Sequence, residues 1–302
     1  MKMIGLTIVL CFLACSVHAQ GCSDAGVCTI GDFYAQKAAH SRKYPKHEVD
    51  YQIVYATHGD YERFYQLQLN YRYIRNAKSF FEIRVPFNYA KQEALDISNS
   101  GVGDIILTYN NQFNFSKQHP VKYSAGLRVS LTDASEGRIG QSTYPMYLQH
   151  GLGTTDILAA ASYDLSKYFN VSTGFQVPVL QYNKNIPLTD SVAASTLYAE
   201  LVRQPDALLK LTGVYEWRKF KFMFSPVAIF HLGNDFYASP TKYIIRNSKG
   251  LTLNLAAELG YMFSKKWKMG AIYAAPIKTR DAIPDGLARS AVVSMKLTYA
   301  FQ

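Results

Sequence analysis

The sequence predicts an all-β protein: a transmembrane antiparallel up-and-down β-barrel of twelve strands that follows a cleaved signal peptide. Three observations carry this prediction. Long segments alternate apolar and polar residues, a short aromatic and basic turn motif recurs along the chain, and aromatic residues reach 14% while charged residues are only 18%. Soluble domains usually contain about 25% charged residues. The composition therefore favours a folded chain whose outer surface contacts an apolar solvent.

The first nineteen residues are expected to be a signal peptide. Lys2 supplies the positive start, residues 4–13 supply the apolar stretch, and Ala19 before Gln20 fits the small-residue cleavage pattern. A lipoprotein signal with Cys15 as the acylated residue is the alternative. Cleavage after Ala19 removes one basic residue and no acidic one, which leaves 31 basic and 22 acidic residues and a net charge of +9. No later apolar run approaches the roughly 18 residues of a membrane-spanning helix.

Residues 20–47 are predicted to form a separate N-terminal segment before a barrel at residues 48–302. The segment lacks clear alternation, and either a plug inside the barrel or a periplasmic tail fits it. Its cysteines, Cys22 and Cys28, are the only ones left after export. We expect them to form a local disulfide, and we identify no metal site.

A short turn motif divides the chain into hairpins. Each copy runs from an aromatic residue to a Lys or Arg, and the five copies end at Arg75, Lys117, Lys167, Lys219 and Lys265, at intervals of 42, 50, 52 and 46 residues. Short turns of such barrels face the periplasm, whereas long loops face outward. We therefore place the five turns in the periplasm and expect outer loops at residues 91–101, 133–152, 181–206, 232–250 and 278–287.

Alternation within the hairpins assigns the two faces of each strand, because successive side chains point to opposite sides of a sheet. In residues 169–179, for example, Phe169, Val171 and Phe175 oppose Asn170 and Gln176. Residues 193–204 fit either an additional strand or a short helix, and fourteen strands is the alternative count. The twelve predicted strands cover residues 48–57, 61–73, 79–90, 102–114, 120–132, 153–165, 168–180, 207–217, 219–231, 251–263, 266–277 and 288–301.

Strand length and aromatic placement separate this barrel from a soluble sandwich, which also alternates. Tilted membrane strands need roughly 9–11 residues, whereas strands of soluble sheets cluster near 5–6. Aromatic residues also gather beside the short turns, as in the girdle of a membrane barrel. They are Tyr71, Tyr73, Phe113, Tyr163, Phe169, Tyr215, Trp217, Phe220, Tyr261, Phe263, Trp267, Tyr299 and Phe301.

With the apolar face against lipid, the ionised residues must face the lumen, because a charge at the lipid midplane costs roughly 2–4 kcal/mol. A narrow polar passage for small solutes follows; an interior filled by mutual ion pairing is the alternative. A basic surplus would favour anionic solutes. The predicted lumen-lining residues are Arg72, Glu82, Arg84, Asp104, Lys122, Arg128, Asp156, Lys210, Glu258 and Lys296.

The turns of the form Tyr-x-x-Ser-Lys, at residues 163–167 and 261–265, and the strand opening at residues 100–107 resemble outer-membrane proteins of the phenol-degradation meta-pathway family. More distantly, the chain is similar to long-chain fatty-acid and aromatic-hydrocarbon channels. The resemblance covers residues 50–302 and implies uptake of small, often hydrophobic molecules. The chain lacks the Asn-Pro-Ala start of the fatty-acid channels. The strand that ends at Phe301 resembles the signature read by barrel assembly machinery.

Two other functions compete with a channel. One is a nonconducting barrel that displays surface loops or docks a periplasmic partner. The other is a hydrolase, for which His58, His150 and His231 near the outer rim are the candidate bases. The His-x-Ser-Asn-Gly signature of outer-membrane phospholipases is missing, so we expect no enzyme. The expected partners are outer-membrane lipids, barrel assembly machinery and a small solute, with no cofactor and no nucleic acid.

Overall fold

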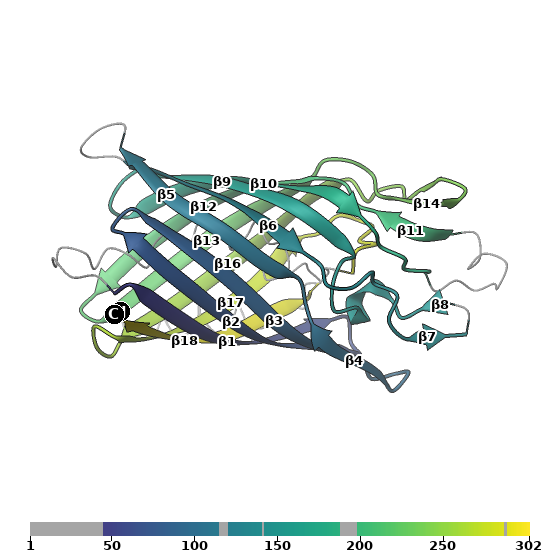
Figure 1. The fold of residues 1–302 in the computed structure, drawn as a ribbon, viewed down its shortest axis with the longest axis horizontal. Coiled ribbons are helices and arrows are strands. Elements are labelled where there is room, and N and C mark those ends of the chain that lie inside the picture. Colours follow the sequence, from purple (N-terminus) through teal and green to yellow (C-terminus); the bar gives the residue numbers. More distant parts are fainter. Residues whose placement is uncertain (1–44, 115–119, 141, 188–197, 287–288) are drawn as a thin grey trace, which may run out of the picture.

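The computed structural model describes residues 45–114, 120–140, 142–187, 198–286 and 289–302, and in this part of the chain a closed antiparallel barrel dominates (Figure 1). β1 pairs with β2 on one side and with β18 on the other, so the first and last strands close the ring. The barrel strands are β1 (His47–His58), β2 (Glu62–Asn76), β3 (Ser79–Gln92), β4 (Ile97–Val102), β5 (Ile105–Asn114), β6 (Pro120–Val129), β9 (Thr154–Asp164), β10 (Phe169–Gln181), β12 (Asp206–Trp217), β13 (Phe220–His231), β16 (Gly250–Met262), β17 (Trp267–Lys278) and β18 (Ala291–Phe301).

The predicted count of twelve strands is confirmed, because β4 and β5 both pair with β3 and occupy one position in the ring. The predicted outer loop at residues 91–101 is wrong. β3 continues to Gln92, and β4 pairs with it from Ile97, which leaves only a tight turn at residues 93–96. Among the described residues, no helix is long and apolar enough to cross a membrane.

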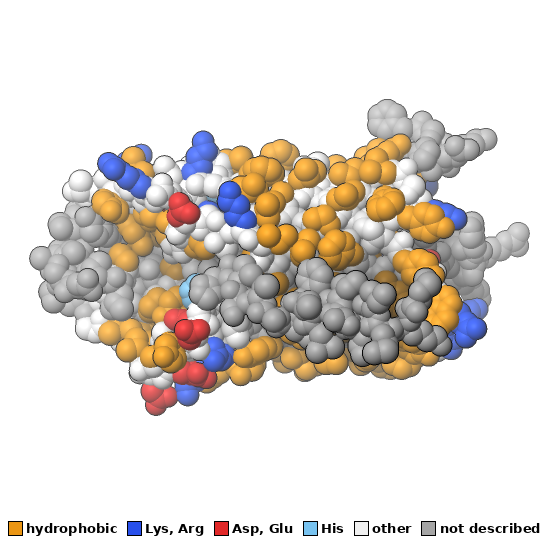
Figure 2. All heavy atoms as spheres, turned by 180° about the vertical axis from the view of Figure 1, so that it is seen from behind, with side chains coloured by type: hydrophobic (Ala, Val, Ile, Leu, Met, Phe, Trp, Pro, Cys, Tyr) orange, Lys and Arg blue, Asp and Glu red, His pale blue; other side chains and the backbone are white. Residues whose placement is uncertain are grey.

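Apolar side chains cover the outside of the barrel, as the alternation predicts. In β2, Tyr65, Leu67 and Leu69 are 46%, 39% and 50% exposed, whereas Gln66 and Asn70 on the other face are 7% and 4% exposed. Hydrophobic side chains accordingly spread along the barrel in Figure 2, and most charged side chains on that face lie toward its two ends. Lipid is the solvent that this surface fits.

A chain of aromatic rings marks the rim at the short turns. The ring centroids of Trp217 and Phe220 are 6.2 Å apart, and those of Phe220 and Tyr261 are 4.8 Å apart. On the next strands, the ring centroids of Trp267 and Tyr299 are 4.6 Å apart. Amphipathic rings favour the headgroup level of a bilayer, so this rim is one boundary of the membrane-spanning part.

The other end carries the long loops, which form a cap with its own structure. The cap contains β7 (Arg138–Ile139), β8 (Ser142–Thr143), a 3-10 helix at Met146–Leu148, β11 (Tyr198–Val202), β14 (Phe236–Pro240) and β15 (Tyr243–Ile244). β11 pairs with β14, so within residues 193–204 the described part favours the strand over the helix. The predicted signal peptide and the Cys22–Cys28 pair lie outside the described residues, as does the turn at Lys117.

Candidate functional site: a charged lumen beneath an inward-folded loop

Residues 130–153, which we call the cap loop, fold into the outer mouth of the barrel. Leu148 in this loop is completely buried. It packs among inward-facing side chains of the barrel wall, namely Val54, Ala56, Phe64, Ala90, Ala274 and Val292. The inner face of the wall is therefore apolar at the level where it receives the loop.

Hydrogen bonds fix the cap loop against β3, β4 and β5. The side-chain amides of Asn88 and Asn99 donate to the carbonyl oxygens of His150 and Leu148, at 2.8 and 3.0 Å. The backbone N–H of Leu152 donates to a carboxylate oxygen of Asp104 at 3.2 Å. The loop therefore contacts the wall through both apolar and polar groups.

Two pairs of glycines allow the close approach of the cap loop. A Cβ at Gly101 would lie 2.6 Å from Nδ1 of His150, and one at Gly151 would lie 2.3 Å from Oγ of Ser130. Gly153 has φ +63°, and a Cβ there would lie 2.7 Å from Cα of Asn183. Glycines at residues 101–103 and 151–153 thus allow the loop to pack closely against the barrel.

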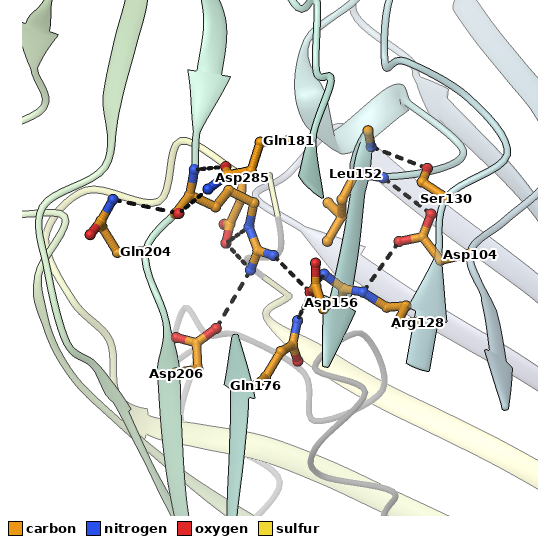
Figure 3. A network of polar contacts seen from close by, with 12 residues as sticks. Asp104, Arg128, Ser130, Leu152, Asp156, Gln176, Gln181, Gln204, Asp206 and Asp285 are labelled. Carbon is orange, nitrogen blue, oxygen red and sulfur yellow. Dashed lines mark hydrogen bonds and ion pairs between the residues drawn. The ribbon is translucent and has the colours of Figure 1, made fainter. Parts of the chain in front are cut away.

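A network of buried ion pairs joins the barrel wall to the outer loops (Figure 3). Asp156 on β9 is fully buried and pairs with Arg128 on β6. Arg203, 2% exposed, lies 3.6 Å from the Asp156 carboxylate and 3.1 Å from the Asp285 carboxylate. Because Asp285 also accepts from Arg280 at 3.0 Å, the network connects the wall to the loops before β12 and β18. These contacts tie the outer loops to the barrel wall.

His231 occupies one end of this network. Its Nδ1 lies 2.7 Å from an Asp206 oxygen, and its Nε2 lies 2.8 Å from an Asp235 oxygen. Both ring nitrogens are therefore engaged by carboxylates, and neither is available to take a proton from a serine hydroxyl. His150 contacts Glu136 at 3.7 Å, and the ring of His58 lies 5.5 Å from that of Tyr147. Each of the three histidines contacts a residue that lies at the outer end of the barrel or in its loops.

Neighbouring charges and hydrogen bonds shift the pKa values of an acidic and a basic group in the outer loops. Burial alone would raise the pKa of Glu136, but hydrogen bonds from His150 and Thr132 outweigh burial and lower it. Burial alone would lower the pKa of Arg203, but Asp285, Asp156 and Asp206 raise it. Both groups therefore stay ionised at neutral pH.

A second polar cluster lies below the cap, nearer the short turns. Arg72 on β2 reaches Glu48 and Asp50 on β1, at 3.3 and 3.0 Å, and Glu82 on β3 at 3.2 Å. Arg84 shares Glu82 at 2.9 Å. All of these side chains point inward and are nearly buried. The cluster braces one wall of the lumen, since it links three neighbouring strands.

Next to this cluster lies a cavity of about 280 Å³ near the short turns, which Arg72 also lines and which we call the inner vestibule. The vestibule is lined by six basic and two acidic residues, Arg72, Arg218, Lys219, Lys221, Lys268, Lys296, Glu216 and Glu258. Its wall is therefore rich in positive charge.

The predicted lumen-lining residues fall into these groups. Arg72, Glu82 and Arg84 lie in the polar cluster, and Asp104, Arg128 and Asp156 lie in the network under the cap. Glu258 and Lys296 line the inner vestibule, and Lys122 pairs with Asp164 at 3.0 Å. Lys210 lies on β12, between the lipid-facing Leu209 and Leu211.

Sequence reasoning missed several residues of the site. Glu48, Asp50 and Lys268 follow the same alternation as their neighbours, so the pattern could have found them. Arg203 and Asp285 lie in loops without periodicity, and no sequence signal pointed to them.

Among the described residues, no group of three or more His, Cys, Asp or Glu side chains is arranged to hold a metal ion.

A closed ring of strands with an apolar exterior, an aromatic rim and a polar interior defines an outer-membrane β-barrel. The solved structures agree: the chain is similar to the COG4313 outer membrane channel from Pseudomonas putida F1, with 14% identity over 86% of this chain and 97% of that chain, and a TM-score of 0.60. TM-scores of 0.46 and 0.42 relate it to the NanC and KdgM porins, at 12% and 8% identity, over 84% of this chain and 99% of each porin. No protein-family profile and no curated protein matches the sequence.

Proposed function

We propose that this outer-membrane barrel is a gated channel for small organic anions. The observation that carries the proposal is the inner vestibule, a cavity of about 280 Å³ lined by six basic and two acidic residues. Carboxylates of the neighbouring polar cluster pair with Arg72 and Lys268, and the other four basic residues add to the positive charge of the wall. Positive charge on the walls of a narrow cleft concentrates anions and repels cations. The likeness of the fold to that of an outer membrane channel supports conduction in general.

In this proposal the solute passes the ten predicted lumen-lining residues, and the cap loop is the gate. The loop closes the outer mouth because Leu148 fills the apolar ring of the wall. The buried network around Arg203 and Asp156 holds the neighbouring loops against it. The channel opens when the loop leaves the apolar ring. The loop then moves between a packed position that blocks the mouth and an open position that does not, as a gate must.

The resemblance of residues 100–107 and of the Tyr-x-x-Ser-Lys turns to the phenol-degradation meta-pathway family adds a hydrophobic or aromatic character to the proposed solute. Benzoate combines both properties, and benzyl alcohol is its neutral counterpart. We therefore expect faster flux of benzoate than of benzyl alcohol or benzylamine through the open channel.

Ion selectivity tests the channel directly. In planar bilayers with a potassium chloride gradient, the reversal potential of the wild-type protein should show that chloride permeates better than potassium. Lys268→Glu with Lys296→Glu, which reverses charge inside the vestibule, should shift the potential toward cation selectivity, because both residues line the cavity.

Lys249→Glu is the control, because this side chain is exposed at the outer end. A nonconducting protein, or a reversal potential that the vestibule variant leaves unchanged, would contradict the proposal.

We further propose that residues 1–19 are removed on export, that assembly machinery reads the strand ending at Phe301, and that Cys22 and Cys28 form a disulfide in the N-terminal segment. Mass spectrometry of the mature chain, with and without reduction before thiol alkylation, tests the cleavage site and the disulfide together. A mature chain that starts elsewhere than Gln20, or thiols that react without reduction, would refute them.

A further inference from the structure

The rim at the short turns carries a ring of exposed positive charge. Four described inner turns, at residues 75–79, 165–168, 217–219 and 263–266, contain no acidic residue. They contribute seven exposed basic side chains: Arg75, Lys78, Lys167, Arg218, Lys219, Lys265 and Lys266. We call these seven residues the cationic ring. The ring faces the periplasm, since short turns of outer-membrane barrels lie on that side.

In the described part of the chain, carboxylates pair with some of the basic side chains at the outer end but with none of those in the ring. At the outer end, Arg63 pairs with Glu93 at 3.6 Å, and Lys184 pairs with Asp133 at 3.0 Å. Within the described ranges, no carboxylate forms an ion pair with a member of the cationic ring. The charge of the ring is thus available to a partner outside the protein.

Ring contacts place part of this charge at the lipid boundary. Nζ of Lys167 lies 4.6 Å from the ring centroid of Tyr168, and Cζ of Arg218 lies 5.2 Å from that of Trp217. Trp217 is 51% exposed and belongs to the aromatic rim, and Tyr168, 48% exposed, directly precedes Phe169 of that rim. Long basic side chains at such a rim keep their charge at the headgroup level.

We propose that the cationic ring binds the phosphate groups of anionic phospholipids in the inner leaflet of the outer membrane. The partner is a lipid because the charges adjoin aromatic side chains that face the bilayer, in the order that headgroups and acyl chains require. Each basic side chain near an anionic lipid surface contributes on the order of 1 kcal/mol. Several acting together select phosphatidylglycerol over zwitterionic lipid.

The chain supplies its own reporter for this ring. Its two tryptophans, Trp217 and Trp267, are 51% and 42% exposed on the aromatic rim. Brominated lipids quench tryptophan fluorescence on contact, so quenching reports the lipid composition next to the ring. The experiment reconstitutes the full-length mature protein into vesicles that contain brominated phosphatidylglycerol or brominated phosphatidylcholine.

The wild-type protein should favour phosphatidylglycerol by roughly fivefold or more, and rising salt should reduce this preference. The test variant replaces basic ring residues that do not line the inner vestibule; it should lose the preference while brominated phosphatidylcholine still quenches both tryptophans. It carries Arg75→Gln, Lys78→Gln, Lys167→Gln, Lys265→Gln and Lys266→Gln. The smaller variant Lys265→Gln with Lys266→Gln should lose part of the preference and guards against a failure to fold.

The matched control neutralises five exposed basic residues at the outer end and should keep the preference. It carries Arg138→Gln, Lys242→Gln, Arg246→Gln, Lys249→Gln and Lys278→Gln, all exposed. Equal quenching by both lipids in the wild-type protein, or a preference that survives in the five-residue test variant, would overturn the proposal. None of these readouts depends on conduction, so this proposal and the channel proposal fail separately.

Discussion

The substitution Leu148→Ala should release the cap loop. Leu148 is completely buried in the ring formed by the barrel wall, and replacement of a buried Leu by Ala costs about 2–5 kcal/mol. The lost contacts exist only while the loop is folded inward, so the loss falls on the closed state. At about 1.4 kcal/mol per factor of ten, the lower limit raises the opening equilibrium of the loop roughly thirtyfold.

Hydrogen exchange measures this opening without any assumption about the solute. The backbone N–H groups of Leu148 and Gln149 donate to the carbonyl oxygens of Pro145 and Met146, at 2.9 and 3.1 Å, within the short helix. Their exchange should accelerate by the same factor of about thirty, and the open probability in bilayers should rise with it. Leu131→Ala is the control, because this side chain is 58% exposed. If both variants exchange at the same rate, Leu148 does not hold the loop.

Three further predictions concern the polar contacts of the cap. Asp156→Asn leaves two buried guanidinium groups without a shared carboxylate, so it should lower the free energy of unfolding by about 3–5 kcal/mol and lower the Tm in detergent. The control Asp96→Asn, in an exposed ion pair, should change the free energy of unfolding by less than about 1 kcal/mol. Equal Tm values for the two variants would contradict the buried network. Gly286→Ala places a Cβ 2.3 Å from the backbone nitrogen of Tyr147 and should expose the cap to protease. Gly140→Ala is the control, because Gly140 has a similar φ of +62° but no atom lies within 4 Å of a Cβ there. Equal cleavage of the two variants would refute the contact between the loops. The pKa of Glu136 lies below its ordinary value of 4.5, so ionised Glu136 stabilises the folded loop fully above pH 4.5, and this stabilisation is lost as the pH falls through the lowered pKa. Amide hydrogen exchange in the loop should therefore accelerate on acidification, and Glu136→Gln should remove that response. A Glu136→Gln variant that still responds to acid would assign the response to another group.

The barrel could be predicted from the sequence because its two signals are local. Every second residue of β10 meets lipid, and the short turns repeat the same residue types, so strand positions followed within a few residues. The lumen-facing charges followed from the same alternation, because the apolar face fixes the position of the other face.

The cap could not be predicted, because its contacts join residues distant in sequence. Arg203 meets Asp285 across 82 positions, and Leu148 fits a ring contributed by five strands. Inward apolar residues such as Val54 and Ala56 interrupt the polar face, but the alternation cannot say what covers them. Tertiary packing of loops leaves no period in the sequence, so the sequence could not predict the cap.

The most direct test of the gated channel removes the cap loop. Ser130 N–H donates to the carbonyl oxygen of Thr154 at 3.0 Å, so these residues lie opposite one another, and an Asn-Gly turn in place of residues 131–153 should join β6 to β9 as a two-residue hairpin. In planar-bilayer recordings, we expect brief, rare openings for the intact protein and steady, anion-selective conductance for the shortened one. A folded, shortened barrel that carries no current would contradict the gated channel.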